Sequence, residues 1–302
     1  MKLAITGATG FVGRHLLNLA VAKGHAVRAL ARRPQDDIDG VEWIEGAIDP
    51  AGNLDALVAG ADAVIHVAGA INARDRAGFA ACNIDGTAAI VTAAQDAGVK
   101  RFVHVSSLAA REPALSDYGW SKAESERRVE SSQLDWTVVR PPAVYGPGDR
   151  EMLELFRMAA RGVVLLPPKG RLSLIEVSDL NRLLLACAKS DSTGIRKIYE
   201  PDDGTVRGLE QREFARLLGA AVDRKVLTLP MPAAVLGAAS MIERLLKRET
   251  AKLTPDRVRY FCHPDWVARR TLAPPVRLWK PKIPSAEGLR ATAEAYRAAG
   301  WL

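Results

Sequence analysis

Three glycines close to the N-terminus limit what this 302-residue chain can fold into more than any other feature of its sequence. Gly7, Gly10 and Gly13 follow an apolar run over residues 2–6 and open an amphipathic helical pattern over residues 11–23. Such glycines allow a tight turn, close helix-to-strand packing, and approach of a diphosphate to N–H groups at the helix N-terminus. A glycine turn without a ligand is the alternative, but its position at the first strand-to-helix junction predicts a dinucleotide site.

The first half of the chain alternates short β-branched runs with helical patterns, which is typical of a parallel sheet covered on both faces. The expected strands are residues 2–6, 26–31, 41–45, 63–67, 101–105 and 136–139, and the expected helices are 11–23, 73–97 and 117–131. We therefore expect an α/β fold with a doubly wound parallel sheet, occupying residues 1–150.

After Arg140 the alternation weakens, and residues 151–302 predict a smaller, mixed α/β, substrate-binding lobe that is partly interleaved with the first domain. Its expected helices are residues 151–160, 177–189, 209–222 and 286–298, its short strands are 172–175 and 196–199, and the proline-rich residues 264–284 are expected to be extended.

Charge and cysteine content narrow the function classes. Residues 243–302 hold 13 Lys/Arg and 6 Asp/Glu, which accounts for the whole net charge of +7, so the body of the chain is neutral. With no aromatic-basic motif, nucleic acid is not an expected partner. The three cysteines are far apart and in no metal-like spacing, so we expect neither a disulfide framework nor a metal site, but a reducing cytoplasm. We expect neither a signal peptide nor a transmembrane helix.

The residues that end the second strand indicate which dinucleotide binds. An acid there bonds the adenine ribose, whereas an arginine accommodates a 2′-phosphate. This strand ends in Arg32 and Arg33 with no acid, which favours NADP(H) over NAD(H). The alternative is that both arginines belong to a solvated loop.

Tyr118 and Lys122 lie four residues apart in a predicted helix and so share a face. An adjacent ammonium favours the phenolate and brings a phenol toward acid/base chemistry. Ser106 or Ser107, after a predicted strand, can donate a hydrogen bond to a substrate oxygen. Each of these alone is more often a surface pair or a turn; together with the glycine turn they predict an active site.

The order of these motifs resembles that of extended short-chain dehydrogenases/reductases, the NAD(P)-dependent epimerase/dehydratase group. The residues that carry the resemblance are TGATGFVG at 6–13, HVAG at 66–69, NIDGT at 83–87, VSS at 105–107, YGWSK at 118–122 and RPPAVYGPGD at 140–149, with looser likeness at 173–180 and near the C-terminus. The resemblance implies a Rossmann-type fold over nearly the whole chain.

The resemblance also implies residue roles. Tyr118 would be the acid/base, Lys122 would lower its pKa and hold the nicotinamide ribose, and Ser107 would polarise the substrate oxygen. Asn83 would brace the central helix, while His66 is expected to be packed structure. The implied cofactor-binding residues are Gly7, Thr9, Gly10, Phe11, Val12, Gly13, Arg32, Arg33, Ile48, Ala68, Gly69, Tyr118, Lys122, Pro141 and Val144.

Three departures from the family pattern bear on the substrate. Ala47 stands where an acid commonly contacts adenine, so Ile48 would contribute only a backbone or packing contact there. The segment between Ser107 and Tyr118 is short, which reduces one substrate-covering loop. The second lobe shows no motif of a nucleotide-sugar pocket.

Three functions are therefore considered. The main expectation is an NADP(H)-dependent oxidoreductase acting on a hydroxyl or carbonyl of a small molecule. The alternatives are a nucleotide-sugar epimerase or dehydratase, and a non-catalytic cofactor-binding sensor or assembly subunit, against which the intact Ser107, Tyr118 and Lys122 argue.

The apolar stretch over residues 229–248 ends in basic residues. It is expected to be a packed helix of the lobe, with contact to an apolar substrate, an anionic substrate or a membrane surface as the alternatives. The cations proposed for such a contact are Arg244, Lys247, Arg248, Lys252, Arg257 and Arg259. A homodimer is also considered.

Overall fold

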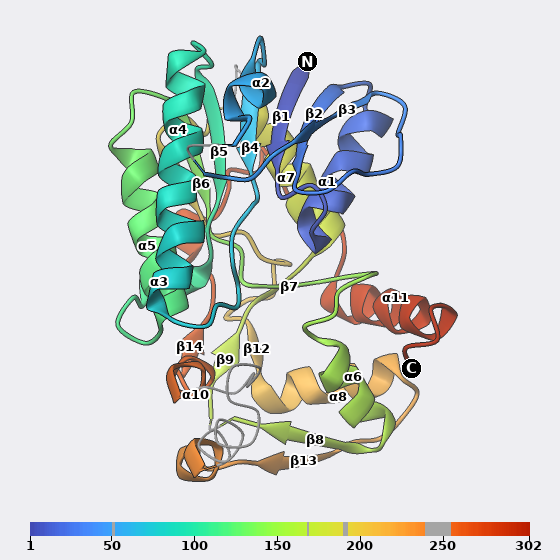
Figure 1. Cartoon of the computed structure of the whole chain (residues 1–302). Coiled ribbons are helices and arrows are strands. Elements are labelled where there is room, and N and C mark those ends of the chain that lie inside the picture. The colour runs from blue at the N-terminus through green and yellow to red at the C-terminus, as the bar shows by residue number, and fades with distance from the viewer. Residues whose placement is uncertain (50–51, 168, 190–192, 239–254) are drawn as a thin grey trace. The chain divides into compact units, whose positions relative to one another are not determined.

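The N-terminal pattern folds into a seven-stranded, all-parallel sheet with the order β11-β6-β5-β4-β1-β2-β3 (Figure 1). Its strands are β1 (Lys2–Thr6), β2 (Ala26–Ala31), β3 (Val41–Glu45), β4 (Ala63–His66), β5 (Arg101–Val105), β6 (Asp135–Val139) and β11 (Lys197–Tyr199). The strand order reverses between β1 and β4, and ligands of doubly wound sheets bind beyond the carboxyl ends of the strands at such a reversal. The predicted fold class is confirmed.

Helices cover both faces of this sheet. They are α1 (Phe11–Ala22), α2 (Leu54–Val58), α3 (Arg76–Phe79), α4 (Gly86–Asp96), α5 (Asp117–Glu130) and α7 (Val177–Ala188). The face under α2, α4 and α5 is packed with aliphatic and aromatic side chains, among them Val64, Ile90 and Phe102. Figure 1 shows α1 and α7 on the opposite side from α4 and α5.

The computed structural model describes residues 1–49, 52–167, 169–189, 193–238 and 255–302, which form two units. The first unit is Met1–Pro141, Ser178–Pro201 and Thr271–Lys280, and the second is Pro142–Val177, Asp202–Arg270 and Pro281–Leu302. The first unit is thus completed by two later segments, which bring it most of α7 and the edge strand β11.

Within the described residues, the second unit is built from small sheets and short helices. Its strand pairs are β7 (Ala143–Tyr145) with β10 (Leu174–Glu176), β8 (Val163–Leu166) with β13 (Leu227–Pro230), and β9 (Arg171–Leu172) with both β12 (Leu209–Glu210) and β14 (Asp265–Trp266). The helices are α6 (Leu153–Ala160), α8 (Gln211–Ala221), α10 (Pro255–Phe261) and α11 (Ser285–Ala298). Aromatic residues of β7, α6, α8 and α11 meet in its core.

Local chemistry explains where elements differ from the expected bounds. The helix expected from residue 73 starts at Arg76, because the Asp75 carboxylate accepts the Gly78 N–H at 2.8 Å and caps it. The helix expected from residue 209 starts at Gln211, where Glu210 and Glu213 form a capping box. The segment 264–284 is not extended throughout, since it holds a 3₁₀ turn at Arg270–Leu272 after the strand β14.

Among the described residues, one helical run, Arg76–Asp96, is long and apolar enough by length and composition to cross a membrane, and half of its apolar window is buried inside the molecule. This run is the central helix of the first unit, and the core described above explains its apolar character. It is not regular throughout, because a π-helix at Ala80–Asp85 separates α3 from α4.

Candidate active site

The glycine turn after β1 brings three backbone segments into contact. Gly7 has φ +70°, and a Cβ placed on it would lie 2.6 Å from the Ala68 amide nitrogen. A Cβ on Gly13 would lie 2.0 Å from the Gly7 carbonyl oxygen. Both positions therefore exclude any side chain. The turn lies against the loop after β4, at the reversal of strand order.

Helix α1 presents its N-terminus at this turn without a side-chain cap. Gly10 is the N-cap in extended backbone, and within α1, all of which is described, no acidic residue occupies the first turn. Thr9 and Gly10 are exposed, and Phe11 and Val12 are half-buried. The first N–H groups of a helix lack intrahelical partners and favour negative charge. The open turn and the uncapped helix thus fit a dinucleotide diphosphate.

Arg32 and Arg33 follow β2 directly, and both side chains are exposed. They lie next to the strand whose neighbour, β1, leads into the glycine turn. Ile48 is half-buried and packs against Gly86, where an added Cβ would approach the Ile48 carbonyl to 2.8 Å. Ile48 therefore contributes packing at this edge, consistent with the absence of an acid at Ala47.

The loop after β4 is held by Asn83, which lies in the π-helix. The Asn83 side chain accepts the Ala70 N–H at 2.7 Å and donates to the Ala70 carbonyl at 3.0 Å. Its amide also donates to the Ser121 hydroxyl of α5 at 2.8 Å. Asn83 thus joins the loop that carries Ala68 and Gly69 to the helix that carries the predicted acid/base. π-helical turns frequently occur at functional sites.

Lys122 is buried at the centre of this arrangement, where its ammonium donates to the Val105 carbonyl at 2.8 Å. A Cβ on Gly69 would lie 3.5 Å from the Lys122 nitrogen, so the exposed Gly69 is next to it. Burial lowers the pKa of Lys122 to about 8, although Glu126 and Cys82 oppose that shift. The pKa of Lys122 is thereby brought closer to neutral than that of a lysine in water.

Tyr118 lies one turn before Lys122 on the same face of α5. Its ring is half-buried, with its centroid 6.1 Å from that of Phe79. The Ser116 hydroxyl caps this end of α5 by accepting the Gly119 N–H at 3.0 Å. The cap fixes where the helix begins and so sets the register of Tyr118 and Lys122.

The structure distinguishes the two serines that follow β5, of which the family resemblance implies Ser107 as the polarising residue. Ser106 is buried, and its hydroxyl donates to the Glu126 carboxylate at 2.5 Å. Ser107 is half-buried at the start of a 3₁₀ turn, Leu108–Arg111, where its hydroxyl accepts the Ala109 N–H at 3.1 Å. The Ser107 hydroxyl keeps its own proton for donation, so this geometry favours Ser107 as the polarising residue.

A buried ionic network behind these serines was not expected from the sequence. Arg140 donates to both Glu126 oxygens, at 2.8 and 2.6 Å, and lies 3.7 Å from Glu200. Arg111 reaches the other oxygen of Glu200 at 3.8 Å. Glu126 is 3% exposed and Glu200 is 1% exposed. The network ties the ends of β5, β6 and β11 to α5. The sequence feature that could have indicated it is Glu126, an acid four residues after Lys122.

Two buried histidines lie under the same strand ends. His66 bonds the Thr6 hydroxyl at 2.7 Å and the Thr87 hydroxyl at 3.0 Å, in line with the expectation that it is packed structure. Its ring stacks on that of His104, with centroids 5.3 Å apart. Burial lowers the pKa of His66 to about 3, and burial likewise places the pKa of His104 well below its ordinary value. Neither imidazole carries charge at neutral pH.

Two expected cofactor contacts fall at the end of the first unit or outside it. Pro141 is buried, and its carbonyl accepts the Leu108 N–H at 3.0 Å, which fixes the turn after Ser107. Val144 belongs to β7 of the second unit, where it pairs with Ile175. The remaining predicted site residues belong to the first unit.

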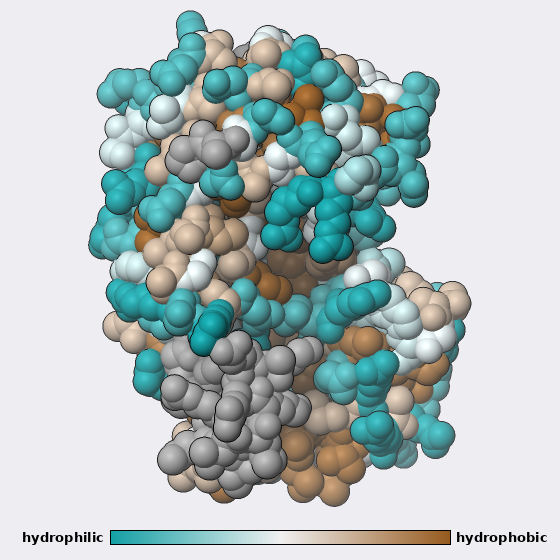
Figure 2. All heavy atoms as spheres, in the orientation of Figure 1, coloured by the Kyte–Doolittle hydropathy of each residue, from teal (hydrophilic) through white to brown (hydrophobic). Residues whose placement is uncertain are grey.

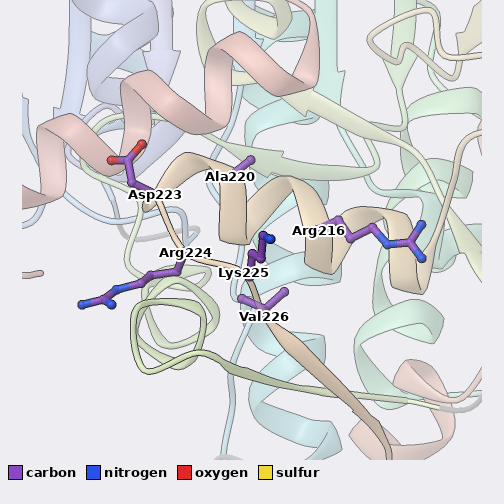
Figure 3. Close-up of a pocket in the computed structure, with 6 residues that line it drawn as sticks. All are labelled: Arg216, Ala220, Asp223, Arg224, Lys225 and Val226. Atoms are coloured by element: carbon purple, nitrogen blue, oxygen red, sulfur yellow. The ribbon is translucent and has the colours of Figure 1, made fainter.

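The second unit carries a surface depression of its own. It is lined by Arg216, Ala220, Asp223, Arg224, Lys225 and Val226 (Figure 3). Arg216 and Arg224 extend in opposite directions, so the cations do not converge on one anion. None of the residues predicted from the sequence lines it.

Comparison with known proteins places this geometry in a family. A family model described as NAD(P)H-binding matches residues 7–156. Ceramide reductase of Caulobacter vibrioides is 38% identical over 310 residues, covering 99% of this chain and 96% of that protein. UDP-glucose 4-epimerase of Vibrio cholerae is 26% identical, covering 98% and 95%. The solved structure of MoeE5 with UDP-glucuronic acid and NAD has a TM-score of 0.75 at 22% identity, covering 99% of both chains.

The chain belongs to the extended short-chain dehydrogenase/reductase family. It is an NAD(P)-dependent enzyme, an oxidoreductase that uses a nicotinamide cofactor and a small-molecule substrate. The predicted family, fold and enzyme class are thereby confirmed, while the individual site residues stay predictions.

Proposed function

We propose that this enzyme is an NADPH-dependent reductase of a keto group on a long-chain, ceramide-type lipid. The observation that carries the proposal is the likeness to ceramide reductase, which extends through the second unit and reaches 38% identity over 99% of the chain. Likeness confined to the first unit would support only the shared cofactor chemistry. Likeness through the second unit supports a shared substrate class.

Chemistry restricts which carbonyl such an enzyme reduces. The amide carbonyl of a ceramide is stabilised by resonance with its nitrogen and is a poor hydride acceptor. A ketone on the long-chain base is a good acceptor, and its reduction yields a secondary alcohol. When bound, the nicotinamide supplies the hydride. The protein must then position the ketone, stabilise negative charge on its oxygen and deliver one proton.

Three side chains of the first unit suit these tasks. Tyr118 donates its phenolic proton to the ketone oxygen as the carbonyl carbon accepts the hydride. Ser107 donates a hydrogen bond to the same oxygen while charge develops there. Lys122, buried and held by the Val105 carbonyl, stabilises the phenolate that Tyr118 becomes. Water then returns the proton to Tyr118.

The preference for NADPH rests on the end of β2. Arg32 and Arg33 are exposed there, and no acid occupies the position that would meet a ribose hydroxyl. A guanidinium donates two parallel hydrogen bonds to a phosphate. No acid at this position repels the 2′-phosphate of NADPH, and two arginines attract it. Both effects favour NADPH over NADH.

The experiment supplies the purified enzyme with NADPH or NADH and an N-acyl lipid that carries a ketone on its long-chain base. We expect NADPH to be consumed and mass spectrometry to show a product two hydrogens heavier. Tyr118→Phe should lower turnover by about 100-fold or more and leave NADPH affinity nearly unchanged. Arg32→Ala with Arg33→Ala should weaken NADPH binding by roughly tenfold and leave NADH binding unaltered.

The epimerase alternative is supported by UDP-glucose 4-epimerase, at 26% identity over most of the chain. It predicts a different result in the same assay, namely conversion of a UDP-sugar without net consumption of cofactor. That result, combined with an unreacted keto lipid, would overturn the proposed substrate. Tyr118→Phe with full activity would overturn the proposed proton donor.

A further inference from the structure

The pair of parallel strands β8 and β13 in the second unit has aliphatic side chains on both faces. Val164 and Leu166 of β8 are buried in the core under α6 and α8. The alternate residues of β8 are Val163 and Leu165, and in register they pair with Leu227 and Leu229 of β13. Paired residues point to the same side of a sheet. These four residues therefore form the outer face of the pair, which we call the β8–β13 face.

Side chains of the β8–β13 face are open to solvent. Leu227 is 61% exposed, Leu165 is 42% exposed and Leu229 is 41% exposed. Figure 2 shows hydrophobic surface over β8 and β13, at the lower edge of the view. A sheet with one solvated face ordinarily alternates apolar and polar residues. Here every outward position of the two strands is aliphatic, which indicates that something apolar covers this face.

Exposed cations gather at one edge of the β8–β13 face. Arg161 lies two residues before the start of β8, and Arg224 and Lys225 closely precede β13. Parallel strands begin at the same edge, and the Leu227 N–H donates to the Gly162 carbonyl at 2.8 Å, which joins the two beginnings. Arg224 and Lys225 also line the depression of Figure 3. Asp223, an acid at this edge, pairs with Arg297 at 3.2 Å.

We propose that the β8–β13 face, with Arg161, Arg224 and Lys225 beside it, is a docking surface for an anionic phospholipid bilayer. Exposed leucines enter the boundary between headgroups and acyl chains, and neighbouring cations meet anionic headgroups. The three cations complement the negative charge of such a bilayer, and the outward positions of both strands carry no acid that would oppose it. The cations need not converge on one ligand, because a bilayer presents many headgroups.

This surface differs from the one considered from the sequence. Of the cations named there, Arg244, Lys247, Arg248 and Lys252 lie outside the described residues, while Arg257 lies 3.8 Å from Glu151. The residues of the β8–β13 face and its three cations, by contrast, are all among the described residues. The docking surface does not rest on the proposed lipid substrate, although a membrane-bound reductase would have ready access to one.

The test is co-sedimentation of the purified full chain with vesicles. We expect binding to vesicles of phosphatidylcholine and phosphatidylglycerol, weaker binding to phosphatidylcholine alone, and loss of binding in high salt. Leu227→Gln with Leu229→Gln should weaken binding by roughly tenfold or more. Reversal of charge at Arg161, Arg224 and Lys225 to Glu should abolish the preference for anionic lipid.

Val276→Gln is the matched control, because Val276 is 79% exposed but belongs to the first unit. It should bind vesicles like the wild type. Unchanged vesicle binding in the double leucine variant would overturn the proposal, as would absence of binding by the wild type. A change from dimer to monomer in that variant, measured by light scattering without vesicles and with vesicle binding intact, would assign the face to self-association instead.

Activity keeps the two proposals apart. A soluble, short-chain keto amide without vesicles should be reduced equally by the wild type and the leucine variant. Loss of vesicle binding with this activity intact supports the docking surface, whereas lack of keto reduction in both proteins counts against the proposed function alone. Equal melting temperatures would show that the variant is folded.

Discussion

At the residue scale, the central question is how a buried lysine keeps its positive charge. Burial lowers the pKa of Lys122 to about 8, and Glu126, one helical turn further along α5, is the first of two groups that oppose this shift. Glu126 is itself held by Arg140 and the Ser106 hydroxyl. The buried carboxylate is thereby held at a fixed position behind Lys122.

We predict that Glu126→Gln lowers the pH at which Lys122 loses its proton. The substitution keeps the shape of the side chain and removes the charge that raises the pKa of Lys122, so that pKa should fall. Keto reduction, measured from pH 6 to 10, should lose its alkaline limb at correspondingly lower pH. NADPH affinity measured across the same range provides a second readout.

Glu124→Gln is the matched control, since Glu124 lies on the same helix but pairs with Arg127 at the surface. Its pH profile should superimpose on that of the wild type. An unchanged profile for Glu126→Gln, in a protein of normal stability, would mean that the ionic network is purely structural.

At the scale of elements, the turn between β1 and α1 shows why the glycine spacing matters. The Gly13 position allows α1 to lie against the Gly7 carbonyl with no room for a Cβ. The same close approach leaves the α1 N-terminus open for a diphosphate. The packing of α1 against the turn and the binding of a diphosphate thus both depend on the absence of a side chain at Gly13.

Gly13→Ala should therefore weaken NADPH binding by at least roughly tenfold and reduce stability by about 1–3 kcal/mol. The added methyl would lie 2.0 Å from the Gly7 oxygen, so α1 must move away from the turn. Fluorescence titration with NADPH and urea unfolding measure the two effects.

Gly60→Ala is the control for backbone strain. Gly60 has φ +62° and open space around its Cβ position, so alanine there costs about 1 kcal/mol of strain without a clash. NADPH affinity should stay at the wild-type value. Equal losses of affinity in both variants would show that stability, rather than the turn, controls binding.

At the scale of the whole molecule, the stacked His66 and His104 pair makes unfolding sensitive to acid. Their pKa values are lowered in the folded state, so the unfolded chain takes up protons first as the pH falls below about 6.5. Each histidine then removes about 1.4 kcal/mol of stability per pH unit. Above that pH both are neutral in either state and contribute no pH dependence.

We predict that the free energy of unfolding, measured in urea, falls between pH 6.5 and 5. In His104→Gln this fall should be less steep by about 1.4 kcal/mol per pH unit, the contribution of one histidine. Phe102→Leu provides the comparison, because it weakens the same core without removing an imidazole. It should lower stability and keep the wild-type slope. If unfolding free energy fell with the same slope against pH in all three proteins, the histidines would not be the cause of the acid sensitivity.

Much of the fold could be predicted because its signals are local. Runs of β-branched residues predicted the strands of the large sheet, and apolar periodicity predicted its helices. Both patterns can be recognised within a few consecutive residues. The glycine turn and the Tyr118–Lys122 spacing are local for the same reason. The starts of α3 and α8 were missed by a few residues because side-chain caps, at Asp75 and Glu210, decided them.

The sequence by itself determined the parallel sheet, the dinucleotide turn and the candidate residues of the active site, since periodicity and turn chemistry act over a few residues. Only the tertiary structure buried Ser106 against Glu126, linked Glu126 to Glu200 through Arg140, stacked His66 on His104, and returned 178–201 and 271–280 to the first unit. Likewise, the β8–β13 face exists only when two distant segments pair. Contacts between segments far apart in the chain leave no periodic pattern, because burial and register are set by the packing of elements rather than by their own residues.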